Sequence, residues 1–259
     1  MHATSNPKRT KPAASVIGRS LDIYYRDRAR TARMDALHAA LVSPGALVFD
    51  IGAHLGDRTG SFLGLGASVV ALEPQPRVFR ALRLIHGRSP GAVLLPMAAG
   101  AAPGELVLHL NPRNPTVATL ERDFIAAAAG APGWQDEVWD SAVTVPVTTL
   151  DALIARHGTP DFVKIDVEGH EPAVLQGLST ALPLLSFEVT MIQRAAARAC
   201  IARLGMLGTY EYNLSLGEEH RLLHDGWQTP QEISATLDAL PAAANSGDVY
   251  ARLVRPACG

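Results

Sequence analysis

A glycine turn between two apolar runs constrains the fold of this chain more than any other feature. Residues 47–73 form an apolar run, a turn with Gly52 and Gly56, a short amphipathic segment, and a second apolar run closed by Glu73. The order strand, glycine loop, helix, strand and acid is typical of a nucleotide-type cofactor site. Glycines let the backbone pass close to a ligand, and the following helix offers free N–H groups. The acid at the tip of the second strand can accept hydrogen bonds from ribose hydroxyls.

The loop sequence discriminates between cofactors. A dinucleotide loop follows G-x-G-x-x-G, whose middle glycine lets the backbone approach the pyrophosphate. Here His54 stands at that middle position, between Ala53 and Leu55, which disfavours a nicotinamide cofactor. A phosphate-binding Walker loop is absent because no Gly-Lys-Ser/Thr follows. An NAD-dependent oxidoreductase remains the alternative.

S-adenosyl-L-methionine has no phosphate, so its site has less need of a third loop glycine. Asp50 at the first strand tip can bind the ammonium group, and Thr59 with the N–H groups near Asp57 can bind the carboxylate. Met97 and Ala98, at the end of a third strand, are expected beside the adenine. The predicted cofactor site comprises Asp50, Gly52, Ala53, His54, Gly56, Thr59, Glu73, Pro74, Met97 and Ala98.

Composition limits the class of protein. The chain has 259 residues, 47% hydrophobic and 19% charged, which indicates one large globular domain. A net charge of −2 argues against a nucleic-acid partner. No apolar run of about 18 residues and no signal-peptide core are present, so we expect a cytoplasmic protein without a membrane partner. Cys200 and Cys258 are too few for a cysteine-rich metal cluster and suit a reducing compartment.

Strand-like and helix-like segments alternate along the chain, which predicts a parallel sheet. We expect a disordered tail over 1–15 and a single domain over 16–259, with N-terminal helices over 16–43. The stretch 111–141, which contains Trp134 and Trp139, is predicted to be an insertion or lid. Strands are expected at 46–50, 67–73, 92–97, 105–110, 143–147, 162–165, 183–189, 208–216 and 249–254, and a helix over 192–204 that stops at Gly205.

Four segments together resemble one family. DIGAHLGDRTGSF, VALEPQPRVFRAL, VPVTTLDAL and FVKIDVEGHEPAVLQG are similar to the FkbM-type S-adenosylmethionine-dependent methyltransferases, with likeness from about residue 47 to residue 188. The KIDVEG run is the most specific part, because it is not generic to methyltransferase folds. The resemblance implies a class I, Rossmann-like methyltransferase fold: an α/β fold with a mostly parallel seven-stranded sheet, an antiparallel C-terminal strand, and helices on both faces.

The KIDVEG run also supplies the candidate catalytic residues. Lys164, Asp166 and Glu168 alternate, so they face one side while the backbone stays extended. Glu188 comes close to them if the next strand is a neighbour. Methylation of a hydroxyl needs a positioned base or a metal that acidifies the hydroxyl. Asp166 could be that base, or Asp166, Glu168 and Glu188 could bind Mg²⁺; we favour the metal-free alternative, because the sequence guarantees no dense carboxylate triplet.

Two of these side chains also have structural interpretations. Lys164 can pair with one of the acids, and Glu168 can cap the helix that begins near Glu171. His170 follows Gly169 directly, so it could face the site as a base or substrate contact, or lie solvated in the first turn of that helix.

The sequence therefore predicts an S-adenosyl-L-methionine-dependent O-methyltransferase. Its expected acceptor is a hydroxyl of a small metabolite such as a sugar, glycoside or polyketide, as in natural product biosynthesis. A homodimer is left open. The alternatives are the NAD-dependent oxidoreductase and a non-catalytic cofactor-binding protein. The acids at 166 and 168 argue against the second alternative, because a protein that only binds the cofactor would not need them.

Overall fold

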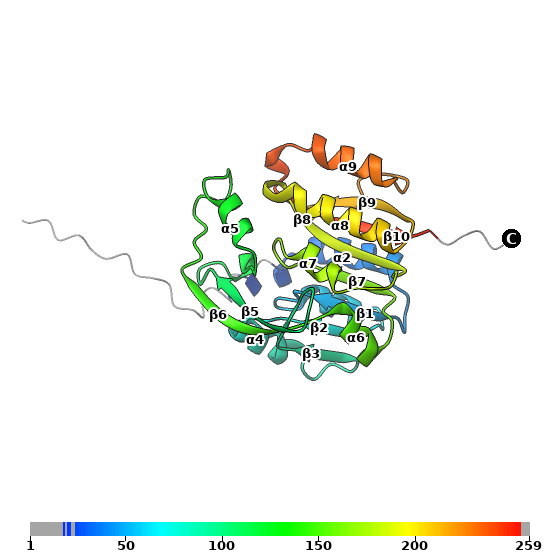
Figure 1. Cartoon of the computed structure of the whole chain (residues 1–259). Coiled ribbons are helices and arrows are strands. Elements are labelled where there is room, and N and C mark those ends of the chain that lie inside the picture. Colours follow the sequence, from blue (N-terminus) through cyan, green and yellow to red (C-terminus); the bar gives the residue numbers. More distant parts are fainter. Residues whose placement is uncertain (1–17, 19, 22–23, 255–259) are drawn as a thin grey trace, which may run out of the picture.

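The computed structural model describes residues 18, 20–21 and 24–254, and Figure 1 shows their arrangement. The predicted disordered tail, residues 1–15, lies outside the described residues, as does Cys258. Residues 24–26 are helical, and α2 (Arg28–Leu41) follows. No helix in the described part of the chain is long and apolar enough to cross a membrane.

The central element is a seven-stranded sheet with the order β3-β2-β1-β7-β8-β10-β9. Strand β10 runs antiparallel to both of its neighbours, and the other pairs from β3 to β8 are parallel. This confirms the predicted mostly parallel sheet with an antiparallel C-terminal strand. The strands are β1 (Leu47–Ile51), β2 (Ser68–Leu72), β3 (Ala92–Leu95), β7 (Phe162–Ile165), β8 (Leu184–Thr190), β9 (Tyr210–Leu216) and β10 (Ser246–Leu253).

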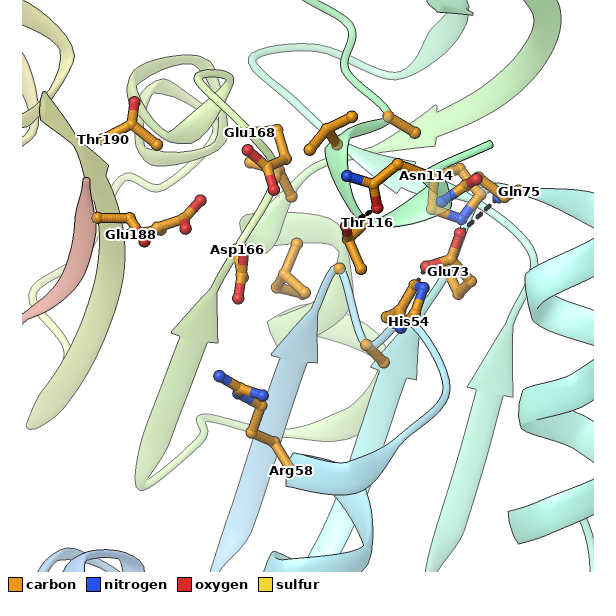
Figure 2. A pocket seen from close by; sticks show the side chains of 18 of the residues that line it. His54, Arg58, Glu73, Gln75, Asn114, Thr116, Asp166, Glu168, Glu188 and Thr190 are labelled. Carbon is orange, nitrogen blue, oxygen red and sulfur yellow. Dashed lines mark hydrogen bonds between the residues drawn. The ribbon is translucent and has the colours of Figure 1, made fainter. Parts of the chain in front are cut away.

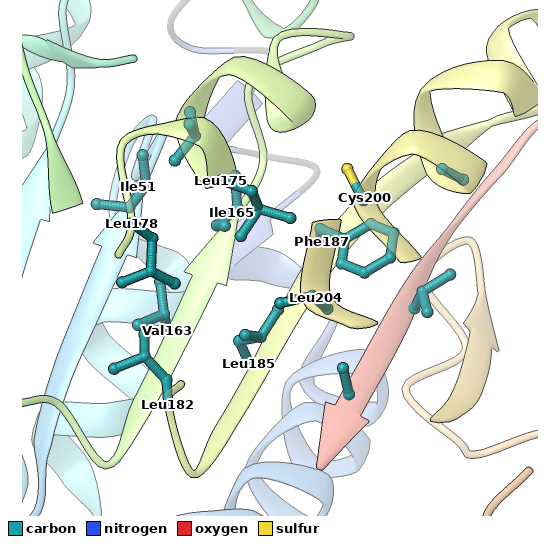
Figure 3. Packing of buried hydrophobic residues seen from close by; sticks show 14 of the residues in the cluster. Ile51, Val163, Ile165, Leu175, Leu178, Leu182, Leu185, Phe187, Cys200 and Leu204 are labelled. Carbon is teal, nitrogen blue, oxygen red and sulfur yellow. The ribbon is translucent and has the colours of Figure 1, made fainter. Parts of the chain in front are cut away.

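Helices cover both faces of this sheet because alternate strand residues point to opposite sides. One core contains Val48 and Phe162 and packs against α2, α3 (Asp57–Gly64) and α4 (Pro76–His86). The other contains Ile165 and Phe187, and Figure 3 shows them packed with side chains of α7 and α8. The helices on that side are α6 (Leu150–His157), α7 (Glu171–Gln176), α8 (Arg194–Leu207) and α9 (Pro230–Ala239).

The start of α6 agrees with a local sequence signal, whereas the end of α8 does not. Thr149, a residue type favoured at N-caps, caps α6 by accepting a hydrogen bond from the Ala152 N–H. The predicted stop at Gly205 is wrong, because α8 continues to Leu207. Helical backbone is accessible to glycine, so its identity alone does not end a helix. The chain turns instead at Gly208, where a side-chain carbon would lie 2.8 Å from Leu253.

A second, three-stranded sheet has the order β4-β6-β5, with β4 (Ala98–Ala99), β5 (Gly104–Leu110) and β6 (Ser141–Thr148). Strand β5 is antiparallel to β6, and the pair lies outside the central sheet. Between them, residues 111–140 contain the 3₁₀ turn η1 (Pro115–Val117) and helix α5 (Arg122–Ala128). This stretch has its own small core around Phe124 and Trp134.

Candidate active site

A cavity of about 350 Å³ opens where β1, β2, β7 and β8 end and β10 begins (Figure 2). Its volume is in the range of sites for small organic ligands. Open α/β sheets bind ligands at this edge. Seven of the predicted cofactor-binding residues line it: Gly52, Ala53, His54, Glu73, Pro74, Met97 and Ala98. The predicted catalytic or metal-binding residues that line it are Asp166, Glu168 and Glu188.

The loop after β1 contains two glycines, Gly52 and Gly56, whose surroundings differ. Gly52 lines the cavity with φ +86°, and a side-chain carbon there would lie 1.8 Å from the Asp166 carbonyl oxygen. Gly56 also has positive φ, but a side-chain carbon on it would meet Leu82 and His86 of α4 at 2.5 Å. Gly56 does not line the cavity. The second glycine therefore allows helix packing, whereas we predicted a cofactor contact.

Glu73 is fixed at the tip of β2. One carboxylate oxygen accepts from the Gln75 N–H at 2.7 Å, and the other accepts from the His54 N–H at 3.0 Å. The side chain is almost completely buried, and burial raises its pKa to about 7 despite these two donors. Each oxygen retains a lone pair that can accept a hydrogen bond from a ligand hydroxyl.

Asp50 and Thr59 do not reach the cavity, which corrects their predicted roles in binding ammonium and carboxylate. The Thr59 hydroxyl donates to the Asp50 carboxylate at 2.5 Å, and both side chains are buried. Asp50 points from the strand toward α3, where Thr59 lies in the first helical turn. Burial raises the pKa of Asp50 to about 6, although the Thr59 hydrogen bond opposes this shift.

An ion-pair network that the sequence did not reveal closes one end of the cavity. Arg58, at the start of α3, donates to Asp57 at 2.8 Å and to Glu218 at 3.0 Å. Arg30 of α2 binds the same two acids from behind. Tyr24 also lines the cavity, and its ring lies edge-on to that of His54 at 5.6 Å.

Three carboxylates converge where β7 and β8 end. Asp166, Glu168 and Glu188 each offer an oxygen, and the three oxygens lie within 4.8 Å of one another (Figure 2). The expected proximity of Glu188 follows from the parallel pairing of β7 and β8. The backbone is not extended through this run, because Glu168 has φ +53°. Burial and the neighbouring acids raise the pKa of Glu168 and of Glu188 well above the ordinary value.

Lys164 lies beneath this cluster and does not line the cavity. Its ammonium group donates to Asp166 at 3.1 Å and to Asp248 at 2.7 Å. Burial opposes the charged form, but these two carboxylates raise the pKa of Lys164 above its ordinary value. This geometry matches the pairing role that we weighed against a catalytic one.

His170 also lies outside the cavity lining. It is buried at the start of α7, and its Nδ1 lies 2.5 Å from a Glu121 carboxylate oxygen. Glu168 does not cap this helix, since the Val167 and Gly169 N–H groups donate to Glu171 instead.

The segment between β5 and β6 reaches the site directly. The Thr119 hydroxyl donates to the Glu168 carbonyl at 2.7 Å, and a side-chain carbon on Gly169 would meet Phe124 at 2.9 Å. The segment therefore packs against the loop that carries Glu168. It also contributes cavity-lining side chains that no motif identified: Asn114, Thr116, Val117, Trp134 and Glu137.

Comparison with known proteins gives a consistent result. A family model described as the Methyltransferase FkbM domain matches residues 50–205. The hexuronic acid methyltransferase AglP of Haloferax volcanii is 26% identical over 149 residues, which are 56% of this chain and 55% of that protein. The match thus spans about half the length of this curated relative.

Solved methyltransferase structures cover most of the chain at low identity. An O-methyltransferase from Bacillus cereus in complex with SAH has a TM-score of 0.46 and 10% identity, over 96% of this chain and 94% of its own. A TehB-like SAM-dependent methyltransferase from Corynebacterium glutamicum has a TM-score of 0.45 and 10% identity, over 93% and 96%.

Proposed function

The chain belongs to the FkbM methyltransferase family, and from that premise we propose that it methylates a hydroxyl oxygen of a small metabolite such as a sugar, glycoside or polyketide. One observation carries this proposal. One end of the cavity contains Gly52 and Glu73 and suits an adenosine ligand. The other end contains the carboxylates of Asp166, Glu168 and Glu188. A binding protein would need the first end only.

The residues at the first end fit S-adenosyl-L-methionine. Gly52 leaves backbone exposed where any side chain would clash, and Glu73 offers buried carboxylate oxygens for the ribose hydroxyls. Met97 and Ala98 line the cavity on the far side of Glu73, where we propose apolar contact with the adenine. When bound, S-adenosyl-L-methionine supplies an electrophilic methyl group.

The residues at the second end would prepare the acceptor. An alcohol is a poor nucleophile until its proton is removed, and a carboxylate within hydrogen-bonding reach can accept that proton. We assign this role to Asp166, whose side chain is 28% exposed, while Lys164 supports it from the buried side. Glu168 and Glu188 would orient the acceptor by accepting hydrogen bonds from its other hydroxyls. This assignment does not require a metal ion.

The segment 111–140, between β5 and β6, suits a polyhydroxylated acceptor. It presents an amide (Asn114), a hydroxyl (Thr116), an indole (Trp134) and a carboxylate (Glu137) to the cavity. Such groups can donate to and accept from several hydroxyls. The relative AglP is a hexuronic acid methyltransferase, which supports a sugar-type acceptor for this chain. The excess of carboxylates around this cavity favours a neutral sugar hydroxyl over a sugar carboxylate.

The test is a methyl-transfer assay with the full chain. Purified protein is incubated with S-adenosyl-L-methionine and a panel of neutral sugars, glycosides, polyketides and uronic acids. We expect an acceptor whose mass increases by one methyl group, with the new methyl placed on a hydroxyl oxygen by nuclear magnetic resonance. Transfer to nitrogen or carbon instead, or transfer only to uronic acid carboxylates, would contradict the proposal.

A further inference from the structure

Arg58 is the cationic side chain that faces the cavity. Among the described residues that line the cavity it is the one arginine, and no lysine lines it. His54 also lines the cavity, but burial lowers its pKa to about 4, so it is neutral near pH 7. Lys164 is held between two carboxylates beneath the cavity floor. An anionic ligand group in this cavity therefore meets its positive partner at Arg58.

The position of Arg58 is fixed before any ligand arrives. Asp57 and Glu218 each accept from a different terminal nitrogen of the guanidinium, at 2.8 and 3.0 Å. An arginine side chain has more N–H donors than these two contacts use. Its side chain is 13% exposed, and Figure 2 shows the guanidinium directed to the Asp166 side of the cavity. A buried, pre-oriented guanidinium suits bidentate binding of a carboxylate.

The order of groups along the cavity indicates which end of the cofactor meets Arg58. Glu73, at the tip of β2, would bind the ribose, and the cavity-lining Met97 and Ala98 follow β3, which lies on the opposite side of β2 from β1. Arg58 follows the Gly52 loop in the chain, and its guanidinium lies on the Asp166 side of the cavity, away from Glu73 (Figure 2). S-adenosyl-L-methionine has its adenine at one end of the ribose and its amino-acid group at the other. The amino-acid group is thus the part that extends toward Arg58.

We propose that Arg58 binds the carboxylate of the methionine moiety of S-adenosyl-L-methionine. The assignment rests on the proposed use of that cofactor, and it replaces Thr59, which is buried against Asp50. The carboxylates of Asp57 and Glu218 beside Arg58 suit the ammonium group of the same ligand. Arg58 is then a specificity residue, since adenosine derivatives without a carboxylate lose this contact.

The test is a thermodynamic cycle, measured by calorimetry, in which both the ligand and residue 58 are changed. Wild-type protein and Arg58→Gln are titrated with S-adenosyl-L-methionine and with its decarboxylated form, which lacks only the carboxylate. A hydrogen-bonded charge pair of this kind corresponds to roughly 10- to 100-fold in affinity. We expect wild type to prefer S-adenosyl-L-methionine by about this factor, Arg58→Gln to lose the preference, and the decarboxylated ligand to bind both proteins alike.

Two variants and one ligand sharpen the test. Arg58→Lys keeps the positive charge but loses the bidentate geometry of the guanidinium, so it should retain part of the preference for S-adenosyl-L-methionine over the decarboxylated ligand. Arg30→Gln removes the other arginine that binds Asp57 and Glu218 but lies outside the cavity lining, so it should change both affinities equally. Equal affinities of wild type for the two ligands, or equal losses in Arg58→Gln, would overturn the proposal. Failure of wild type to bind even 5′-methylthioadenosine would overturn the cofactor assignment itself, a result distinct from the other two.

Discussion

The α-carbon of Gly52 faces the backbone carbonyl of Asp166 so closely that a side-chain carbon on Gly52 would lie 1.8 Å from that oxygen. The contact joins the cofactor loop to the loop that carries the proposed base. It exists because β1 and β7 are parallel neighbours, and the Asp166 N–H donates to the Ile51 carbonyl at 2.9 Å. The two ends of the cavity therefore depend on one backbone contact.

Gly52→Ala should disturb both ends of the site at once. The residue has φ +86°, which is unfavourable for alanine, and the added carbon would push the Asp166 backbone away. We expect a loss of about 2–4 kcal/mol in the free energy of unfolding, together with weaker cofactor binding. Gly64→Ala is the matched control. Gly64 lies in α3, and a side-chain carbon added there would have no neighbouring atom within 4 Å, so this change should leave the free energy of unfolding unchanged or raise it by about 0.5–1 kcal/mol. Denaturant unfolding of both variants checks the prediction, and equal stabilities would contradict it.

The sequence predicted the cofactor loop and the acidic cluster because both follow from short-range patterns. The apolar runs before Gly52 and before Asp166 define adjacent parallel strands, and parallel strands present their carboxyl ends at one edge. Glu188 was expected near these acids if its strand neighboured the KIDVEG strand, and the parallel pairing of β7 and β8 meets that condition. The extended backbone assumed through Glu168 is wrong, because Glu168 has φ +53°.

The side-chain directions around the loop could not be predicted in the same way. Asp50 of β1 and Thr59 of α3 face each other inside the protein, while Arg58, the residue before Thr59 in α3, faces the cavity. The helix start fixes this rotation, and Gly56 sets that start through its contact with α4. Cavity-lining residues of the segment 111–140, such as Asn114 and Trp134, depend on the tertiary packing of that segment, in which Phe124 lies against Gly169 and Trp134, and no motif identified them.

Cofactor binding should release protons near neutral pH through Glu73. Burial raises the pKa of this carboxyl to about 7, so below that pH it is largely protonated in the free protein. Ribose hydroxyls donate to the ionised form, and binding therefore expels the proton. We expect the affinity for S-adenosyl-L-methionine to fall as the pH drops below about 7. Calorimetry in buffers of different ionisation enthalpy measures the released protons directly.

The variant Glu73→Gln separates this carboxyl from the other buried acids. It cannot ionise, so its cofactor affinity should be lower and its proton release smaller than in wild type at the same pH. Asp50 and Glu171 also have raised pKa values, of about 6 and about 7, and the pKa values of Glu168 and Glu188 are raised as well, but all four acids remain in the variant. Unchanged proton release in Glu73→Gln would assign the titration to one of these other acids.

Asp166→Asn should abolish most turnover while it preserves cofactor binding. An amide cannot accept the acceptor's proton, and general-base catalysis is typically worth about 10²–10⁴-fold in rate. Asp225→Asn, a change to an exposed aspartate outside the cavity lining, is the control and should leave the rate unchanged. Rates at saturating cofactor, combined with calorimetric affinities, check the prediction. Turnover near the wild-type value in Asp166→Asn would place the base elsewhere.

Removal of divalent ions should leave turnover unchanged. The Lys164 ammonium already lies 3.1 Å from Asp166, and the proposed base needs no metal to accept a proton. The oxygens of Asp166, Glu168 and Glu188 are nonetheless close enough to share one ion. Dialysis against a chelator, followed by assays with and without added Mg²⁺, distinguishes the mechanisms. A rate that falls on dialysis and returns with Mg²⁺, but not in Glu188→Gln, would make the cluster a metal site.

Lys164→Met should be among the most destabilising single changes in the sheet. Lys164 lies between Asp166 and Asp248, and its side chain and that of Asp248 are 4% and 9% exposed. Without the ammonium, Asp248 becomes a buried carboxylate with no positive partner, which typically costs about 3–5 kcal/mol. The double variant Lys164→Met with Asp248→Asn removes that stranded charge and should recover a large part of the loss. Chemical denaturation at neutral pH measures both values, and a double variant as unstable as Lys164→Met alone would show that Lys164 acts through packing and not through its pairing with Asp248.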